Sequence, residues 1–312
     1  MIERPRRRVR LGFASNLALA LVAIATVVAC GTLAGIDDYT IGECKGGPCA
    51  PDASDFDSVF DEDARVLPPD DSGVPCPGKP APPAVRVGAP GNTFCIDTTE
   101  VTNAQYDEFI AAKVDPKSQP AECVWNSSFA RERPDGGGIP NEPAVGVDWC
   151  DARAYCSWAG KYLCGKVENG KKTGPVTLEG LSDYKSHQWM LACSAEGRLR
   201  YPYGGLHDPE KCNLAELDAG AALPVGTAPG CVGGYQGIHD LVGNVWEWFD
   251  GPCTNDRALE VDGGDGGPAS DGCLLKGGSY VDRGPAHDCR NESSNVRRDL
   301  RQRNVGFRCC SD

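Results

Sequence analysis

The chain has 312 residues, with 44 acidic side chains, 31 basic side chains and 17 cysteines. Its formal net charge of −13 argues against nucleic-acid binding, because such a surface must be basic to displace counterions from phosphates. The cysteines are too many for a reducing cytosol. Zinc sites explain them poorly, because the sequence has no CxxC pair and only four histidines. The composition therefore predicts disulfides, an oxidising compartment and either one large domain or two small ones.

Residues 1–29 have the pattern of a secretory signal peptide. Arginines precede an apolar run from Leu17 to Ala29, which is shorter than the about 20 residues of a membrane-spanning helix. The run ends in Val-Val-Ala-Cys at Cys30, which resembles the lipobox of bacterial lipoproteins, so Cys30 is the expected lipidation site. Gly31 stands where an aspartate typically retains such proteins in the inner membrane. We therefore expect a lipoprotein of the outer membrane in a bacterial cell envelope, with a permanent transmembrane anchor as the alternative.

Residues 30–83 are expected to form a tether between the lipid and a folded domain. The segment is rich in Asp, Pro and Gly, so it cannot bury enough apolar surface to offset the entropy of ordering. A local Cys44–Cys49 disulfide is the simplest account of its first two cysteines. Setting the lipidated Cys30 aside leaves 16 cysteines of the 17, which eight disulfides would use completely.

The folded domain is expected to run from residue 84 to residue 312, and a capping box marks its first helix. Thr102 is followed three residues later by Gln105, a spacing in which each side chain bonds to the backbone of the other residue. The pair predicts a helix over about 103–112.

Two further helices are expected before the chain changes to loops and short strands. Asp148 and Asp151 have the spacing of a second capping box, and Gly160 ends the helix that they begin. A third helix is predicted over about 184–195, around Trp189. The remaining sequence alternates short apolar runs with Gly, Pro and Asp, which is typical of loops and short strands.

Several motifs follow one another through the domain in a recognisable order. They are Phe94-Cys-Ile-Asp-Thr-Thr-Glu-Val-Thr-Asn, Pro143-Ala-Val-Gly-Val-Asp-Trp, Ala154-Tyr-Cys-Ser-Trp-Ala-Gly-Lys, Tyr201-Pro-Tyr-Gly, Gly237-Ile-His-Asp-Leu-Val-Gly-Asn-Val-Trp-Glu-Trp, Lys276-Gly-Gly-Ser-Tyr and Asn304-Val-Gly-Phe-Arg-Cys. Together they resemble the formylglycine-generating enzyme, or sulfatase-modifying factor, family. The resemblance implies a single α+β domain of the C-type-lectin-like fold, low in regular secondary structure and rich in disulfides.

The resemblance also locates the expected reaction cleft. Enzymes of this family oxidise a cysteine of a sulfatase peptide to formylglycine, using oxygen and a copper(I) ion held by two thiolates, which are soft ligands. Counted from Ser279, the two thiolate positions are Asp282 and His287 in this chain, so copper is not expected. The cleft candidates are therefore Ser279, Asp282, His287 and Arg290. A harder metal bound by Asp282 and His287 is an alternative, as is a free Cys289 that would replace a lost thiolate.

Two structural disulfides of the family map onto this sequence as Cys156–Cys309 and Cys193–Cys289, and the second would remove Cys289 as a copper ligand. The remaining cysteines suggest two local bridges, Cys212–Cys231 and Cys253–Cys273. The pairing of the last six cysteines stays open. They are Cys76, Cys95, Cys123, Cys150, Cys164 and Cys310.

The resemblance further implies structural calcium, for which carboxylates and main-chain carbonyls are suitable hard ligands. The first implied ligand set is Asp240, Gly243, Val245 and Glu247. The second, which rests on fewer matches, is Asn213, Leu214 and Asp218. A pair of capping carboxylates without a metal is the alternative to the first set.

Three functional hypotheses follow. The preferred one is an envelope lipoprotein that has lost the copper chemistry and serves as a binding or structural module. Its ligand would be a protein, a peptide or a glycan, and its N-terminal lipid would attach it to the membrane. The second is an enzyme of the family that uses other cleft residues to oxidise or otherwise modify a small molecule. The third is a calcium-dependent, lectin-like receptor.

Overall fold

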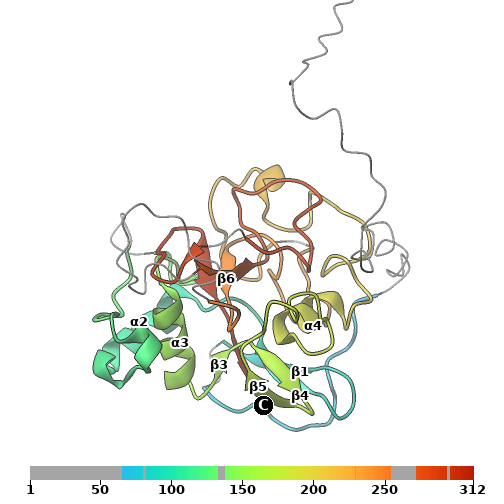
Figure 1. Cartoon of the computed structure of the whole chain (residues 1–312). Helices are drawn as coiled ribbons and strands as arrows, with labels where there is room; N and C mark the ends of the chain where they lie inside the picture. Colours follow the sequence, from blue (N-terminus) through green and yellow to red (C-terminus); the bar gives the residue numbers. More distant parts are fainter. Residues whose placement is uncertain (1–64, 80–81, 133–137, 229, 254–271, 294–295) are drawn as a thin grey trace, which may run out of the picture. The chain divides into compact units, whose positions relative to one another are not determined.

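The computed structural model describes residues 65–79, 82–132, 138–228, 230–253, 272–293 and 296–312 (Figure 1). The expected signal peptide, the expected lipidation site Cys30 and the expected Cys44–Cys49 disulfide lie outside them. Within the described ranges, no helix has both the length and the apolar character needed to cross a membrane.

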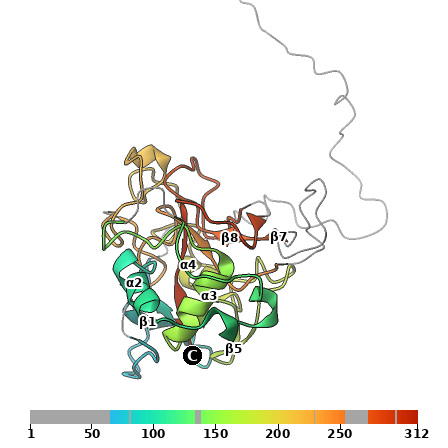
Figure 2. The same cartoon turned by 90° about the vertical axis from the view of Figure 1, so that its left-hand side faces the viewer.

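Two helices begin at the capping boxes that the sequence predicts. α2 spans Asn103–Ala111, where the Thr102 hydroxyl accepts a hydrogen bond from the Gln105 backbone N–H and the Gln105 side chain accepts one from the Thr102 N–H. α3 spans Trp149–Trp158 and has the same reciprocal arrangement at its N-cap, Asp148. Figures 1 and 2 show α2 and α3 side by side.

The third helix is shorter than expected. α4 spans Gln188–Ser194, whereas the sequence predicted a start near residue 184. The preceding residues form a turn around Asp183, whose carboxylate accepts hydrogen bonds from the Lys185 backbone N–H and the Ser186 hydroxyl. Local side-chain bonds of this kind compete with helix formation, so the helix begins only after the turn. Three short 3₁₀ helices complete the helical structure: η1 (Pro116–Ser118), η2 (Ala121–Cys123) and η3 (Ala215–Leu217).

The strands are short. They are β1 (Ala84–Val87), β2 (Phe94–Asp97), β3 (Tyr162–Leu163), β4 (Lys166–Glu168), β5 (Lys171–Gly174), β6 (Trp246–Trp248), β7 (Gly272–Cys273), β8 (Leu275–Lys276), β9 (Val296–Arg297), β10 (Val305–Phe307) and β11 (Cys309–Ser311). One antiparallel sheet has the order β1-β2-β11-β3, and a second sheet has the order β10-β6-β8, in which β10 and β6 are parallel. The pairs β4-β5 and β7-β9 form two further antiparallel ladders. Because β10 and β11 are separated by one residue, Arg308, the end of the chain joins both larger sheets.

The described core consists of two main clusters of buried side chains. One surrounds Trp189 of α4 and includes apolar residues of β1 and β2. The other joins α2 and α3 to β6 and β10. In the second cluster Tyr106 stacks on Tyr155 with ring centroids 5.8 Å apart, and Phe307 meets Tyr155 edge-on at 5.3 Å. Such aromatic pairs add specific geometry to the burial of apolar surface.

Seven disulfides cross-link the described residues, and they account for all 14 cysteines in these ranges. Four join the pairs expected from the sequence: Cys156–Cys309, Cys193–Cys289, Cys212–Cys231 and Cys253–Cys273. The other three settle the pairing that the sequence left open: Cys76–Cys95, Cys123–Cys150 and Cys164–Cys310. Disulfides limit the freedom of the unfolded chain, which compensates for the small amount of regular structure.

The folded region begins before the expected boundary at residue 84. Cys76 is bonded to Cys95 of β2, and the Leu67 N–H donates to the Gly234 carbonyl at 2.8 Å. The Lys79 N–H donates to the carbonyl of Ala159, immediately after α3. The segment contributes few apolar side chains and is held by backbone bonds and one disulfide, which is why its composition alone indicated a tether.

Candidate functional site

A pocket of about 550 Å³ lies where β6, β8, β9 and β10 meet the loop that follows β8. We call it the His287 pocket. It is lined by Trp246, Leu275, Asp282, His287, Asn291, Glu292, Ser293, Val296, Arg297, Leu300, Gln302, Asn304 and Val305. It therefore contains both positions, Asp282 and His287, that correspond to the thiolates of the resembling family. A mixed apolar and polar lining of this volume is typical of ligand sites.

One wall of the pocket is a chain of hydrogen bonds centred on Ser279. The Ser279 hydroxyl donates to Asp282 Oδ2 at 2.6 Å, and its backbone N–H donates to the same oxygen at 2.9 Å. Asn304 Nδ2 donates to the Ser279 hydroxyl at 3.1 Å. Because Ser279 is fully buried and its oxygen is already bonded, it holds Asp282 in place and is not exposed as a nucleophile.

His287 lines the same pocket and contacts a different set of residues. Its Nδ1 is 2.9 Å from the Asn291 amide, and its ring meets the Trp246 ring edge-on at 6.1 Å. Gly278 has a φ of +81°, and a Cβ there would lie 3.0 Å from His287 Nδ1. The glycine of the Gly-Gly-Ser motif therefore allows both the turn and the close approach of the imidazole.

Arg290 does not belong to this pocket. Its guanidinium pairs with Asp288 at 3.0 Å, and its carbonyl accepts a hydrogen bond from the buried Lys276 ammonium at 3.0 Å. The four cleft candidates of the sequence therefore fall into three groups: Ser279 with Asp282, His287 with Asn291, and Arg290 with Asp288 outside the pocket.

Sequence reasoning missed several lining residues. Asn304 lies in a motif that was recognised, but its role depends on a contact across the fold, the hydrogen bond that its amide donates to the Ser279 hydroxyl. Trp246 also lies in a recognised motif, and it lines the pocket while partly buried. It is two residues from the buried Trp248 in the same short strand, so both side chains have the same strand parity and the sequence pattern alone does not separate their roles.

The donors of the His287 pocket do not fit copper(I). The copper sites of the resembling enzymes need two thiolates, and here the corresponding groups are a carboxylate and an imidazole. Cys289 is bonded to Cys193, and no described cysteine carries a free thiol. The arrangement therefore supports ligand contacts and offers no soft metal site among the described residues.

The first expected calcium set is buried, but its carboxylates already have partners. Glu247 accepts hydrogen bonds from Arg308 on both oxygens, at 2.7 to 3.0 Å, and from the Trp189 indole at 2.8 Å. Asp240 accepts one from the Gly226 N–H. The Glu247 carboxylate is thus already bonded to Arg308 and Trp189, and the calcium-ligand role that the resemblance implies for it stays a prediction.

The second expected set lies directly against the first. The Asn244 N–H donates to the Asn213 carbonyl at 2.8 Å, and a Cβ on Gly243 would lie 2.6 Å from that carbonyl oxygen. The side-chain oxygen of Asn213 is buried without a hydrogen-bond partner, whereas Asp218 is exposed. The Leu214 carbonyl accepts a hydrogen bond from the Leu217 N–H. Asn213 alone presents an orphaned oxygen that a cation could use.

Metal binding itself stays a prediction. Within the described residues, no group of three or more His, Cys, Asp or Glu side chains is arranged to hold an ion. A calcium site here would therefore depend on main-chain and amide oxygens as much as on carboxylates.

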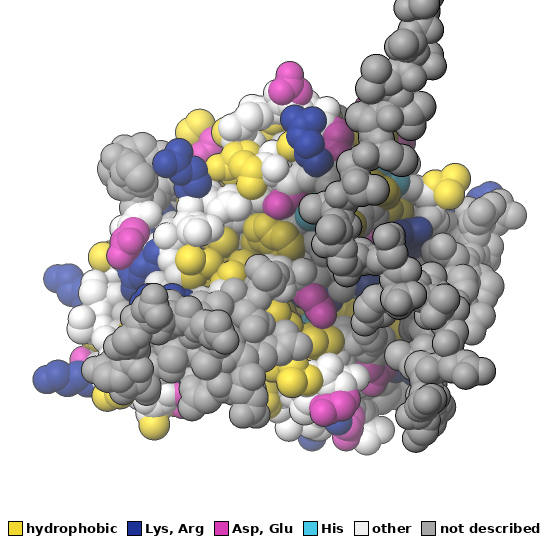
Figure 3. Space-filling model, turned by 45° about the horizontal axis from the view of Figure 1, so that its top comes forward, with side chains coloured by type: hydrophobic (Ala, Val, Ile, Leu, Met, Phe, Trp, Pro, Cys, Tyr) yellow, Lys and Arg dark blue, Asp and Glu magenta, His cyan; other side chains and the backbone are white. Residues whose placement is uncertain are grey.

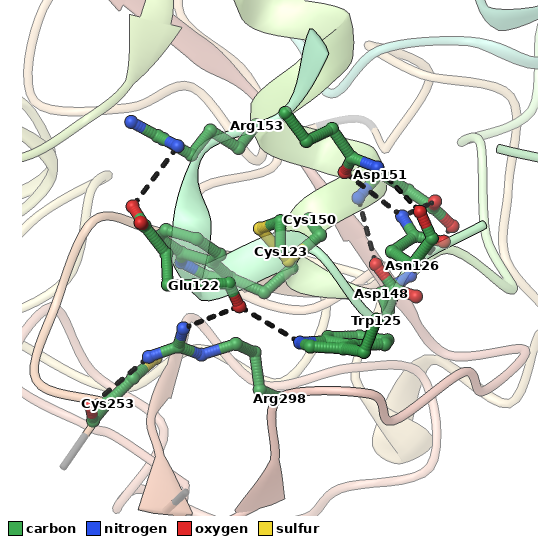
Figure 4. Close-up of a disulfide and its surroundings, with 12 residues drawn as sticks. Glu122, Cys123, Trp125, Asn126, Asp148, Cys150, Asp151, Arg153, Cys253 and Arg298 are labelled. Atoms are coloured by element: carbon green, nitrogen blue, oxygen red, sulfur yellow. Dashed lines mark hydrogen bonds and ion pairs between the residues drawn. A yellow bond between two sulfur atoms is a disulfide. The ribbon is translucent and has the colours of Figure 1, made fainter. Parts of the chain in front are cut away.

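The arginines near the C-terminus are largely used within the protein. Arg297 pairs with Asp299, and Arg301 pairs with Asp148 and Asp151. Arg298 is buried and donates to the carbonyls of Glu122 and Cys253 (Figure 4). On the face seen in Figure 3, the described Lys and Arg side chains are scattered among acidic ones and form no continuous basic surface.

The fold and the pocket define a disulfide-rich α+β domain with a ligand-sized cavity at the ends of short strands. Residues 62–312 match the model of the sulfatase-modifying factor enzyme 1-like domain, and the chain belongs to this family. This confirms the family and the fold class that the motifs indicated.

Its similarity to individual members is moderate. The chain is 28% identical to the formylglycine-generating enzyme of Bos taurus over 280 residues, which cover 74% of this chain and 68% of that enzyme. It is 31% identical over 188 residues to the inactive C-alpha-formylglycine-generating enzyme 2 of Bos taurus, over 54% of this chain and 50% of that protein. Among solved structures, PvdO from Pseudomonas aeruginosa aligns with a TM-score of 0.46 and 20% identity, over 70% of this chain and 80% of the other.

Proposed function

We propose that this chain is a member of its family without oxidase chemistry, and that it binds a ligand in the His287 pocket at the bacterial cell envelope. The observation that carries the proposal is a pocket of ligand size that is lined by Asp282 and His287, the two residues that the resemblance matches to the copper-binding thiolates. A cavity that has lost its redox donors but keeps its volume can still bind.

The lining favours a peptide or a protein loop as the ligand. Trp246, Leu275 and Leu300 supply apolar surface, and Gln302 supplies an amide at the exposed rim. An amide both donates and accepts hydrogen bonds, which matches the alternating N–H and C=O groups of a peptide. A glycan is the alternative ligand class for this pocket.

The loss of chemistry is tested with the reaction of the family. The full chain is incubated with copper(I), oxygen and a Cys-x-Pro-x-Arg peptide, and aldehyde is measured by mass spectrometry. We expect none, because the pocket has no thiolate to hold copper. Aldehyde formed by the unmodified protein would contradict the proposal.

A double variant sharpens this test. Asp282→Cys combined with His287→Cys restores two sulfur donors at the matched positions, so it should bind copper(I) where the parent does not. Copper(I) binding is followed by competition with a chromophoric chelator. If the parent protein competes with the chelator equally well, it binds copper(I) through groups other than those at positions 282 and 287.

Binding is tested separately with a Ser-x-Pro-x-Arg peptide, which cannot be oxidised. We expect Trp246→Ala to weaken its binding by tenfold or more, since about 1.4 kcal/mol corresponds to tenfold in affinity. Trp125→Ala, which changes a half-buried Trp outside the pocket, is the matched control. Equal affinity in all three proteins would place the ligand elsewhere.

The envelope location rests on the first thirty residues. Expression in a bacterial host with an alkynyl fatty acid should label the protein, and Cys30→Ser should remove the label and release the domain from the membrane fraction. Labelling that survives Cys30→Ser would contradict the lipid anchor at this residue.

A further inference from the structure

A second pocket of about 550 Å³ lies on α3, and its described lining residues include none of those that line the His287 pocket. We call it the Trp158 pocket. It combines the aromatic rings of Trp158 and Tyr162 with the charged side chains of Arg153, Lys172 and Asp250. Its volume lies within the range of about 300 to 1,000 Å³ that small-molecule sites occupy.

The Trp158 ring is held in a fixed position. It contacts Phe109 and Tyr155, each with ring centroids 5.6 Å away. The Lys79 ammonium lies 4.3 Å from its centroid, yet Lys79 does not line the pocket. A partly buried Trp ring that is fixed on its neighbours offers a flat apolar surface at little entropic cost.

The walls beside this ring are also rigid. The Cys123–Cys150 disulfide lines the pocket and ties η2 to the first turn of α3 (Figure 4). Cys156 of α3 is bonded to Cys309 of β11. The pocket is therefore built on elements that cross-links hold together, which reduces the cost of ordering it around a ligand.

The charges in the pocket occur as ion pairs. The Lys172 ammonium is 2.5 Å from Asp250, and the Arg153 guanidinium is 3.2 Å from Glu122. Lys161, a third cation of the lining, is buried and pairs with Asp97 at 2.6 Å. An anionic ligand would have to break such a pair before it gained one of its own, so these cations do not favour an anion.

Paired charges suit a ligand whose groups both donate and accept hydrogen bonds. A hydroxyl can donate to the Asp250 carboxylate while it accepts from Lys172, and this ion pair does not have to separate. A ring that carries several hydroxyls around an apolar face would fill the pocket with its face on the Trp158 ring.

From this combination we propose that the Trp158 pocket binds an uncharged carbohydrate without a metal ion. The inference does not rest on the proposed function of the His287 pocket, because the two pockets have separate linings. The proposed binding mode also differs from that of a calcium-dependent lectin. Ion-paired side chains of the described lining, and not a calcium ion, would contact the hydroxyl groups of the sugar.

The test is isothermal titration calorimetry of the full chain in detergent with four tetrasaccharides: cellotetraose, maltotetraose, chitotetraose and the anionic tetragalacturonate. We expect at least one uncharged tetrasaccharide to bind, with the same affinity in the presence of a calcium chelator. Binding of tetragalacturonate alone, no binding at millimolar concentration, or loss of binding on chelation would each overturn the proposal.

Variants locate the site. Trp158→Ala should weaken binding at least tenfold, and Trp125→Ala, at a half-buried Trp outside the pocket, should not change it. Since Trp158 also packs on Phe109 and Tyr155, Arg153→Gln provides a second variant at a partly exposed side chain, with an expected loss of threefold or more. Circular dichroism confirms that each variant is folded. Unchanged affinity in a folded Trp158→Ala or Arg153→Gln protein would overturn the assignment of the pocket.

Discussion

Two buried charge clusters of this domain are built from the same groups but differ in how completely those groups are paired. The helix-cap cluster consists of Asp148, Asp151, Asn126 and Arg301, and the central cluster consists of Glu100, Asp240, Glu247 and Arg308 with Asn244. Each cluster has one guanidinium. The helix-cap cluster opposes it with two carboxylates and the central cluster with three.

Every carboxylate oxygen of the helix-cap cluster has a partner (Figure 4). Asp148 accepts from the Asp151 N–H and from Arg301, and Asp151 accepts from the Asp148 N–H and the Asn126 amide. Arg301 also lies 2.9 Å from Asp151. The cap of α3 and the ion pair therefore satisfy the same carboxylates.

The central cluster leaves one oxygen without a partner. Arg308 donates to Glu247, to the Asp97 carbonyl and to the His239 carbonyl, and none of these bonds reaches Glu100 or Asp240. Glu100 receives one hydrogen bond, from the Asn244 amide, and its other oxygen has none. Burial, followed by the charge of Asp240, raises the pKa of Glu100 well above its usual value.

This difference shows where the domain holds uncompensated negative charge. The helix-cap cluster has one carboxylate more than its arginine offsets, and every one of its carboxylate oxygens is bonded. The central cluster has two more carboxylates than Arg308 offsets and leaves one oxygen of Glu100 unbonded, so its need for a proton or a further cation is the greater. The Gly-Asn-x-Trp-Glu-Trp turn and Asn213 lie beside the central cluster. The prediction of calcium in this part of the molecule thus agrees with its charge, even though the Glu247 side chain is occupied by Arg308.

Removing Arg308 should have the largest effect on stability. Arg308→Met leaves Glu247 buried without its cation, next to two further carboxylates, so we expect the free energy of unfolding to fall by about 3 to 5 kcal/mol. Urea denaturation with the disulfides intact measures the change. A loss below about 1 kcal/mol would mean that Arg308 does not compensate the central carboxylates.

Removing Arg301 should cost less. Its side chain is 13% exposed, so water can partly replace its contacts with Asp148 and Asp151, and we expect Arg301→Met to lower the free energy of unfolding by about 2 to 3 kcal/mol. Arg303→Met, at an exposed residue two positions later, should change it by less than about 0.5 kcal/mol. If Arg301→Met lowered the free energy of unfolding by more than Arg308→Met does, the central cluster would not be the one that depends more on its arginine.

The features that sequence predicted well are those set by neighbours in the chain. The capping boxes at Thr102 and Asp148 fixed the starts of α2 and α3, because a capping bond spans only three residues. The start of α4 was predicted four residues early, because the hydrophobic pattern around Trp189 does not reveal the turn at Asp183.

The features that sequence could not predict depend on strand pairing. Cys95 pairs with Cys76 and Cys164 with Cys310, and the second bond follows from the alignment of β11 beside β3. Cysteine spacing carries no information on that register. The His287 pocket shows the same limit: Asn304 and Trp246 come together because β10 runs parallel to β6, although both lie in motifs that were recognised.

Calcium provides a test of the central cluster alone. If the ion binds there, millimolar Ca²⁺ should stabilise the protein by about 1.4 kcal/mol when its concentration is tenfold above the dissociation constant, and a chelator should reverse the change. Thermal unfolding measures it. Asp240→Asn should abolish the effect, whereas Asp151→Asn in the helix-cap cluster should leave it intact. Equal stabilisation of both variants would place the ion elsewhere.

The helix-cap cluster should reveal itself through pH. Burial, followed by the nearby charge of Asp148, raises the pKa of Asp151 to about 8 from its ordinary value of 3.8. The folded protein therefore keeps this proton at pH values where the unfolded chain has lost it, so the free energy of unfolding must fall as pH rises from about 4 towards 8. We expect the free energy of unfolding to fall by on the order of 1 kcal/mol between pH 6 and pH 8. The release of one proton can change this free energy by at most about 1.4 kcal/mol per pH unit. Urea denaturation at both pH values measures the fall.

Asp151→Asn carries no ionisable group and should show a flatter profile, since its amide can still accept the Asp148 N–H bond. If parent and variant lose stability equally over this range, Asp151 is already ionised in the folded protein, and Arg301 would then compensate both carboxylates of the cap.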